Sequence, residues 1–243
     1  MKAILVAVDY ADILGVTLPY NRHHFDEVMI VTTPTDLAIH KIAEENNATI
    51  YATTSFYDNG AVFNKWKALE EGLDALGREG WLCLMDADVM WPKQVPDYPR
   101  EVGCLYTPLR RMMRKIRMPI PPEAEWDQFT LHRQQVEWAG FSQIFHCSDP
   151  HLGLAPWHEI NWRHAGGADS IFQLKWPNNR KVRPPFEVLH LGPSGCNWCG
   201  RATERLDGTV PDGSEEKMQQ VRNFIKTRRG KNGARRFDGE KIL

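Results

Sequence analysis

The stretch LCLMDADVMWP, residues 82–92, decides the fold and the chemistry expected of this chain. It begins as an apolar run of strand length, and two aspartates, Asp86 and Asp88, follow with one alanine between them. Like charges this close raise each other's pKa unless a positive charge lies between them. A buried strand that ends on such a pair therefore predicts a bound cation.

The segments before this stretch alternate between strand and helix patterns. Apolar runs typical of strands buried on both faces, and segments with apolar residues near helical spacing, follow one another up to residue 91. The strand patterns occupy 2–10, 26–33, 48–54 and 81–89, and the helix patterns 35–47 and 64–80. This order predicts an α/β fold with a mostly parallel, Rossmann-type sheet flanked by helices.

Ligands on such sheets bind beyond the carboxyl ends of the strands, which is where Asp86 and Asp88 lie. If the strand continues to Val89, both carboxylates point to the same face. Two carboxylates at this spacing suit a hard divalent cation that prefers oxygen ligands. A pair in a solvated loop is the alternative, and the position after a buried strand favours a functional pair.

The pattern becomes irregular after residue 92. Strands are predicted at 101–109, 136–146 and 186–192, and a short helix at 170–176. Residues 110–128, rich in Pro and Arg, predict a long loop or helical insertion over the site. We expect a single domain over residues 1–215 and a polar, basic tail over 216–243, in which KTRRGKNGARR (226–236) carries six bases and no acid.

Composition narrows the class of protein. The 243 residues are 42% hydrophobic with a formal net charge of -1, so attraction to nucleic acid or membrane must come from a local patch. The chain has no apolar stretch of 18 residues, and its start, MKAILVAVDYAD, reaches an acid too early for a signal peptide. These features predict a cytoplasmic protein without a membrane span.

The cysteines leave two interpretations open. Five cysteines without a secretion signal indicate reduced thiols rather than a disulfide framework. Cys196 and Cys199 form a single CxxC, and Cys147 with His146 or His151 could complete a zinc site. The alternative is unpaired thiols packed beside the tryptophan of CNWC.

The order of elements, the D-A-D after the fourth strand and the later His-Leu-Gly resemble GT-A-type glycosyltransferases over about residues 1–195. This resemblance implies transfer of a sugar from a nucleotide diphosphate sugar to a hydroxyl acceptor. It also implies that Asp86 contacts the ribose or the metal and that Asp88 binds Mn2+ or Mg2+ at the diphosphate. His190 becomes the candidate third metal ligand, and an imidazole favours Mn2+; a hydrogen-bonded core histidine is the alternative.

The same resemblance assigns roles to residues around HAGGADSIFQLKW. Asp169 would be the general base that deprotonates the acceptor, and Gly166 and Gly167 would let the backbone approach the sugar. Asp169 could instead cap the helix that follows. Lys65, beside Asn64, is a candidate contact to the diphosphate, or else an ordinary lysine on a helix surface.

The ends of the first two strands are candidate nucleotide contacts. Thr33 and Asp36, with Thr32, end the second strand, where the family often recognises the base, although a helix-capping turn explains them equally well. Asp9 and Tyr10 end the first strand and would line the same pocket.

Several alternatives remain for function and acceptor. A nucleotidyltransferase would need a Gly-rich loop after the first strand, whereas DYADILGVTLPYN has one glycine, and a D-x-D-x-[TV] phosphatase would not have Met90. A non-catalytic module that binds nucleic acid through the basic tail is a further possibility. Compact chains with basic tails resemble virus-encoded glycosyltransferases that modify hydroxymethylated bases in DNA. The acceptor is therefore a DNA base, a glycan, a protein or a lipid, the last docked through RRMMRKIRM (110–118) as an amphipathic patch.

Overall fold

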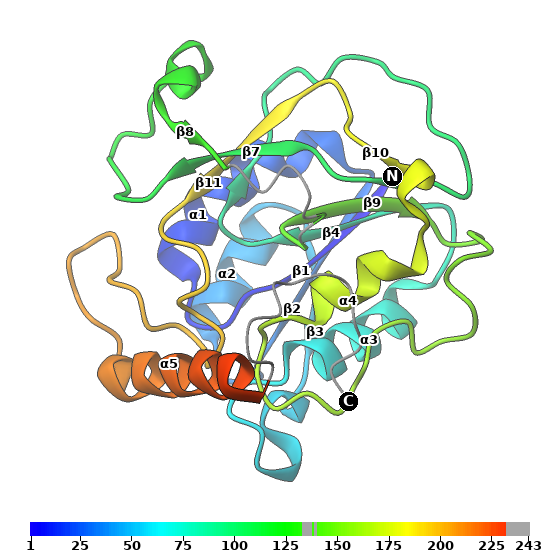
Figure 1. Cartoon of the computed structure of the whole chain (residues 1–243). Coiled ribbons are helices and arrows are strands. Elements are labelled where there is room, and N and C mark those ends of the chain that lie inside the picture. Colours follow the sequence, from blue (N-terminus) through cyan, green and yellow to red (C-terminus); the bar gives the residue numbers. More distant parts are fainter. Residues whose placement is uncertain (133–137, 139, 232–243) are drawn as a thin grey trace.

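The computed structural model describes residues 1–132, 138 and 140–231 and has an α/β architecture built on a seven-stranded sheet (Figure 1). The order of its strands is β10-β6-β9-β4-β1-β2-β3, and the four consecutive strands β4, β1, β2 and β3 run parallel, with β3 at one edge. β9 lies antiparallel to β4 and β6, so the sheet is mostly parallel, as predicted. The strands are β1 (Lys2–Val6), β2 (Glu27–Thr32), β3 (Thr49–Ala52), β4 (Trp81–Asp86), β6 (Leu105–Tyr106), β9 (Ser142–His146) and β10 (Lys181–Val182).

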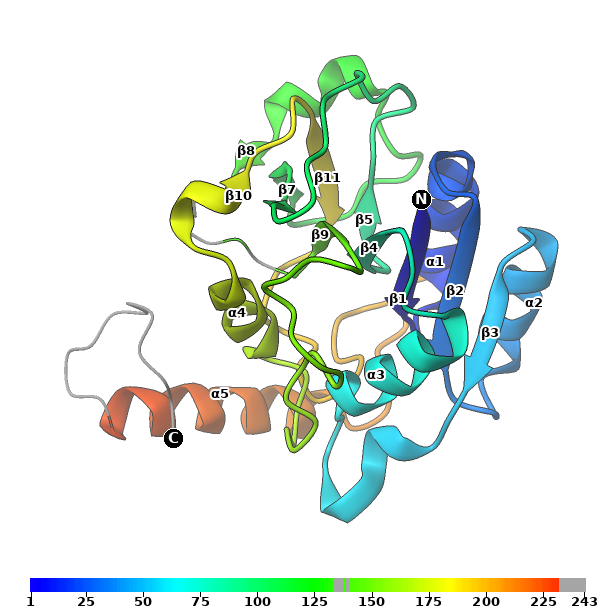
Figure 2. The same ribbon diagram turned by 90° about the vertical axis from the view of Figure 1, so that its right-hand side faces the viewer.

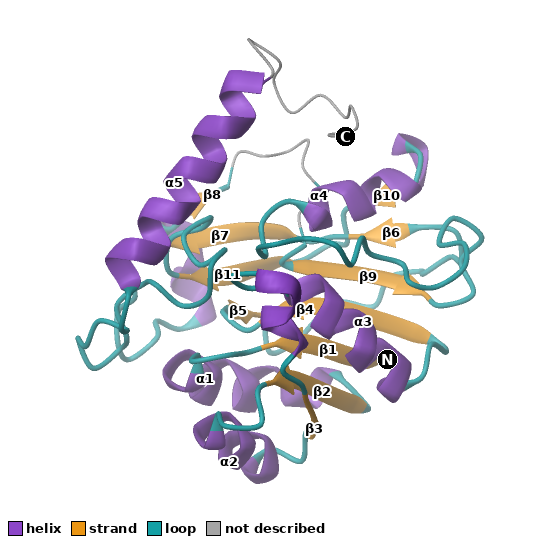
Figure 3. Cartoon of the chain, turned by 90° about the horizontal axis from the view of Figure 1, so that it is seen from below, coloured by secondary structure: helices purple, strands orange, loops and turns teal. Residues whose placement is uncertain are grey.

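Helices cover both faces of this sheet (Figures 2 and 3). Because side chains alternate along a strand, Ala3 and Leu5 of β1 pack on one face with residues of α1 and α2, and Ile4 and Val6 pack on the other with residues of α3 and α4. Both faces are therefore buried, which is why β1 and β4 read as continuous apolar runs. The helices are α1 (Ala11–Asn21), α2 (Leu37–Glu45), α3 (Lys65–Leu76) and α4 (Ala168–Phe172), with short 3-10 helices at Arg22–His24, Ser55–Gly60, Glu123–Gln128, Gln173–Lys175 and Asn178–Arg180.

A second, four-stranded sheet was not expected from the sequence. Its order is β5-β11-β7-β8, with β7 parallel to β11 and the other pairs antiparallel. It packs around Met90, Met113, Trp126 and Leu189, with Ile13 of α1. The strands are β5 (Val89–Met90), β7 (Leu109–Met113), β8 (Thr130–Leu131) and β11 (Glu187–Leu191).

Three local predictions were wrong. Residues 110–128 were predicted to form a long loop or helical insertion, but Leu109–Met113 form strand β7, which buries Met112 and Met113 and pairs Arg111 with Glu187. No helix was predicted between the first two strands, but this segment forms helix α1. The fourth strand ends at Asp86, and a turn separates it from β5, so the two aspartates do not continue one strand.

The C-terminal part of the described chain is helix α5 (Ser214–Lys231), which leads away from the sheet (Figure 2). It buries Val221 and contacts the ring of His164 through Phe224. Residues 232–243, which hold the end of the predicted basic tail, lie outside the described residues. Among the described helices, none is both long and apolar enough to span a membrane.

Gly72 tests the packing of α3 on the sheet. A Cβ at Gly72 would lie 2.5 Å from Cγ2 of Val31, whereas one at Gly15 of α1 would lie 3.7 Å from its nearest neighbour, Cδ1 of Ile42. We expect Gly72→Ala to destabilise the protein by about 1–3 kcal/mol through overpacking, despite the better helix propensity of alanine. Gly15→Ala should stabilise it by up to about 1 kcal/mol. Urea unfolding of both variants checks this, and equal effects would contradict it.

Candidate active site

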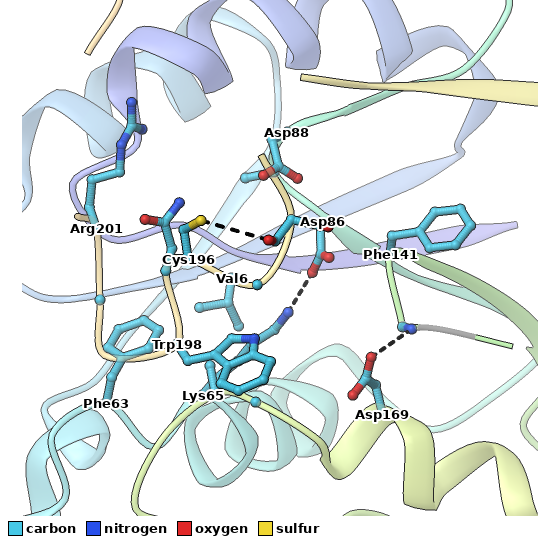
Figure 4. A pocket seen from close by; sticks show the side chains of 18 of the residues that line it. Val6, Phe63, Lys65, Asp86, Asp88, Phe141, Asp169, Cys196, Trp198 and Arg201 are labelled. Carbon is cyan, nitrogen blue, oxygen red and sulfur yellow. Dashed lines mark hydrogen bonds and ion pairs between the residues drawn. The ribbon is translucent and has the colours of Figure 1, made fainter. Parts of the chain in front are cut away.

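A pocket of about 390 Å³ opens at the carboxyl ends of β1 and β4 (Figure 4). It is the place where a ligand is expected on a parallel sheet. Five of the eight site residues predicted from the sequence line it: Lys65, Asp86, Asp88, Asp169 and His190. They come from four segments that are far apart in the sequence, which the fold brings together.

The turn that carries the two aspartates is held by buried hydrogen bonds. Asp86 N donates to the carbonyl of Phe141 at 3.0 Å. From α1, Thr17 Oγ1 donates to the carbonyl of Ala87 and Asn21 Nδ2 donates to the carbonyl of Val89, both at 2.7 Å. Thr17 and Asn21 are four residues apart, so they lie on one face of the helix. One face of α1 therefore fixes the backbone of the turn.

His190 is brought beside Asp88 by backbone pairing between β11 and β5. His190 lies opposite Val89 in the antiparallel register, and Leu191 N donates to the carbonyl of Asp88 at 2.8 Å. His190 Nε2 consequently lies 3.6 Å from Asp88 Oδ1. Burial raises the pKa of Asp88, and the neighbouring Asp86 adds to this, while His190 and Lys65 oppose it.

Lys65 provides a cation in the pocket. Its Nζ donates to Asp86 Oδ1 at 2.5 Å, and the two side chains are only 17% and 30% exposed. Burial lowers the pKa of Lys65, but Asp86 and, more weakly, Asp169 and Asp88 outweigh it and leave the pKa above its ordinary value. Lys65 is therefore charged and lies among three carboxylates, rather than facing solvent as a helix-surface lysine.

The carboxylate oxygens of Asp86 and Asp88 and the imidazole nitrogens of His190 are atoms of the kinds that bind divalent cations. Within the described part of the chain, Asp88 Oδ1 and His190 Nδ1 are buried atoms without a hydrogen-bond partner, and a buried carboxylate oxygen that accepts no hydrogen bond favours a cation. However, no group of three or more His, Cys, Asp or Glu among the described residues is arranged to hold a metal. The reason is visible in Figure 4, where the carboxylate of Asp86 faces Lys65. Asp88 and His190 lie together, and Asp86 would have to turn from Lys65 to join them.

Asp169 lies on the opposite side of the pocket from the aromatic residues Phe63 and Trp198 (Figure 4). Helix α4 begins at Ala168 after Gly167, and no side chain caps it, so the capping role considered for Asp169 was wrong. Its Oδ2 instead accepts a hydrogen bond from Gly140 N at 2.9 Å. Gly140 must be glycine at this distance, because a Cβ there would lie 2.4 Å from that of Asp169.

A buried pair links the helices that carry Lys65 and Asp169. The imidazole of His158 stacks between the rings of Trp66 on α3 and Phe172 on α4, with centroids at 5.0 Å and 4.2 Å. Its Nδ1 lies 2.6 Å from Oε1 of Glu70, also on α3. Burial is the largest cause of the lowered pKa of His158, so the ring is neutral and donates to Glu70 near pH 7.

The other three predicted residues do not line this pocket. Asp36 caps α2 by accepting from Ile39 N, and its second oxygen accepts from Asp9 N at 2.7 Å. Asp9 forms an ion pair with Arg205. Thr33, nearly buried, lies 3.4 Å from Thr35 through their hydroxyl oxygens. Their contact with a nucleobase stays a prediction.

The sequence reading missed a strap, residues 193–206, that follows β11 and forms one wall of the pocket through Pro193 to Trp198, Gly200 and Arg201. Arg201 is fully buried, forms two hydrogen bonds with the carboxylate of Asp12 at 3.2 and 3.1 Å, and lies over the ring of Tyr10. Asn197 also donates to the hydroxyl of Tyr10. The strap is thereby fixed to the first βα connection, a contact between residues nearly 190 positions apart.

Gly166 lets the strap approach the pocket. A Cβ at Gly166 would lie 2.3 Å from Cδ2 of Trp198, so only glycine fits against that indole. Gly166 was predicted to let the backbone approach the sugar. In the structure, the ring of Trp198 is what requires a glycine at this position. The glycine in the sequence indicated a close approach, but it did not indicate that Trp198 is the residue in contact.

The zinc alternative at CNWC was wrong for the ligands considered. Cys196 lines the pocket at the carboxyl end of β4, whereas Cys147 N bonds to the carbonyl of Gly80, at the start of that strand. A six-residue strand is roughly 20 Å long, so these thiols are far apart. His146, opposite Trp81, is at the same distant end. All five cysteines are free thiols.

Comparison with known proteins supports the fold. No family model and no curated protein matches the chain. The crystal structure of a mycobacterial protein aligns with 99% of this chain and 77% of its own, at 13% identity and a TM-score of 0.50. That likeness shows a shared fold alone, in agreement with the predicted α/β architecture.

Two further structures align less well. The inositol-1-phosphate CTP transferase from T. maritima aligns over 91% of this chain and 96% of its own, at 8% identity and a TM-score of 0.45. Mannosyl-3-phosphoglycerate synthase from Rubrobacter xylanophilus aligns over 46% of this chain, at 15% identity and a TM-score of 0.31, and this chain spans 40% of its length.

Arg201 and Arg205 allow a matched test of the strap. We expect Arg201→Met to lower the free energy of unfolding by about 3–5 kcal/mol, because it leaves the carboxylate of Asp12 buried without its partner. Arg205→Met, which breaks the more exposed pair with Asp9, should cost at most about 1 kcal/mol. Urea denaturation measures both, and a loss in Arg201→Met no larger than that in Arg205→Met would contradict the predicted dependence of the strap on the buried pair.

Proposed function

We propose that this chain is a metal-dependent glycosyltransferase that moves a sugar from a nucleotide diphosphate sugar to a hydroxyl acceptor. The observation that carries the proposal is the convergence of Asp86, Asp88, His190, Lys65 and Asp169 in one pocket at the carboxyl ends of β1 and β4. Acidic groups at the strand ends can hold a cation, and basic groups there can contact phosphate. Such a sheet edge suits a diphosphate and the sugar attached to it.

The two sides of the pocket suit the two parts of the reaction. Val6, Phe63 and Trp198 form an apolar side that suits a flat base, while Asp169 and Phe141 lie on the other side (Figure 4). A donor that lies across the carboxylates would then place its sugar near Asp169. This orientation is what a base acting on the acceptor requires.

Asp88 and His190, with Asp86, would hold a Mn2+ or Mg2+ ion, and Lys65 would contact the diphosphate. When bound, such an ion supplies Lewis-acid neutralisation of the charge on the departing diphosphate. Asp169 takes the proton of the acceptor hydroxyl, and the acceptor oxygen forms a bond to the anomeric carbon. The bond from that carbon to the diphosphate breaks, and its electron pair leaves with the nucleoside diphosphate.

The acceptor stays a prediction among a hydroxymethylated DNA base, a glycan, a lipid and a protein. The DNA alternative depended partly on basic residues 226–236, of which 232–236 lie outside the described residues. Transfer of labelled sugar to hydroxymethyl-pyrimidine duplex DNA, compared with transfer to glycan, lipid and protein acceptors, distinguishes these possibilities. Binding that falls steeply with salt would support DNA.

Asp88→Asn tests the cation. We expect it to weaken Mn2+-dependent donor binding at least about 100-fold, because even residues that only support metal ligands contribute 10–100-fold. A thermal-shift panel of nucleotide diphosphate sugars with and without Mn2+ identifies the donor, and titration calorimetry then measures its affinity in both proteins. Asp74→Asn, at an exposed position of α3, is the control and should behave as wild type. Unchanged Mn2+-dependent binding in Asp88→Asn would contradict the proposed site.

Asp169→Asn tests the base. Asparagine keeps an oxygen that can accept from Gly140 N, so the fold of α4 should be retained. We expect turnover to fall by about 10²–10⁴-fold, while the dissociation constant of the donor changes only a few-fold, because the base acts on the acceptor. Steady-state kinetics and donor titration provide the two values. A lower melting temperature with normal turnover would assign Asp169 a structural role.

A further inference from the structure

Lys65 occupies a position that helix stability does not explain. It is the first residue of α3, directly after the capping residue Asn64. A positive charge is unfavourable at a helix N-terminus, where the backbone dipole is itself positive. The position is explained by the carboxylates around it, since Nζ of Lys65 lies 2.5 Å from Oδ1 of Asp86.

Lys65 also has little freedom to leave the pocket. Its side chain is 17% exposed, it lines the pocket, and its ammonium lies 5.2 Å from the ring centroid of Trp66. Trp66 in turn is fixed by donating Nε1–H to the carbonyl of Ala165 and by its stack on His158. The ammonium therefore stays near Asp86 and can exchange partners only within the pocket.

We propose that Lys65 is a tethered cation that competes with the divalent ion for Asp86 and so couples binding of the ion to binding of the donor. The proposal rests on the proposed function. In the protein without ligands, Lys65 neutralises Asp86. It weakens binding of the divalent ion alone, because the ammonium of Lys65 and the ion are both positive and repel each other.

Binding of the sugar donor relieves the competition between Lys65 and the divalent ion. A diphosphate brings new negative charge to the pocket, and the ammonium of Lys65 gains a partner there when the divalent ion takes Asp86. The ion and the donor therefore bind with positive cooperativity, and by linkage each raises the affinity of the other by the same factor. When no donor is bound, the ion must displace Lys65 from the carboxylate of Asp86.

Calorimetric titration of Mn2+ tests this in the wild type and in Lys65→Met, which keeps the apolar stem but removes the charge. Each protein is titrated alone and with the nucleoside diphosphate that gives the largest thermal shift in Mn2+. We expect Lys65→Met to bind Mn2+ alone about tenfold more tightly. We also expect the enhancement by the nucleoside diphosphate to fall by about tenfold or more.

Three variants provide controls. Lys65→Arg keeps the charge and should resemble wild type, and Lys65→Gln replaces Lys65→Met if that variant does not fold. Lys67→Met is the matched control, because Lys67 is on the same helix but pairs with Asp58 and does not line the pocket. It should leave both affinities unchanged.

The outcomes separate this proposal from the proposed function. Suppose that Mn2+ binding requires Asp88 and that Lys65→Met binds Mn2+ no more tightly than wild type. This result overturns the role of Lys65 and leaves the metal-dependent site standing. Mn2+ binding only after loss of Lys65 supports the tethered cation but contradicts metal dependence of the wild type. Absence of Mn2+ binding in both proteins overturns the proposal.

Discussion

The burial of two carboxylates in one turn is the constraint on which the rest of this structure depends. Asp88 is only 15% exposed, and burial together with Asp86 disfavours its charged form. Lys65 pairs with Asp86 and His190 lies near Asp88, so both carboxylates have a basic neighbour. Thr17 and Asn21 separately satisfy the carbonyls of the turn. A turn that needs so many partners is unlike an ordinary solvated loop.

These partners explain the unusual additions to the sheet. β11 pairs with β5 directly after the turn, which places His190 and starts the strap that forms one pocket wall. The strap then returns to the first βα connection through Arg201 and Asp12. The second sheet is therefore part of the site's construction, since without it neither the histidine nor the strap would reach the carboxyl end of β4.

The proposed chemistry depends on charge balance within the pocket. Three carboxylates surround Lys65, while Arg110 and Arg201 also line the pocket and Arg201 is paired with Asp12. In the proposed mechanism a divalent ion adds positive charge beside the phosphate, and Lys65 contacts the diphosphate. The carboxylates also differ in their partners: Asp86 pairs with Lys65 and Asp88 lies beside His190, while Asp169 accepts a hydrogen bond from Gly140 N.

The sequence by itself determined the parallel core of the fold and most of the residues of the candidate site. Apolar runs with intervening helical patterns define β1 to β4, because a strand buried on both faces leaves a local signal. The D-A-D after β4 indicated the site, since the carboxyl ends of parallel strands meet at one edge. Lys65, Asp169 and His190 were named from a family resemblance.

Only the tertiary structure decided which groups meet. The pairing of Lys65 with Asp86, the place of Asp169 opposite Gly140, and the strap held by Arg201 join residues separated by 21, 29 and 189 positions. The short strands β5 and β7 were missed because two to five residues carry almost no periodicity, and their pairing partners are distant. Periodicity reports whether a segment is buried, but contacts between distant segments depend on how the buried faces pack, and no local pattern encodes that.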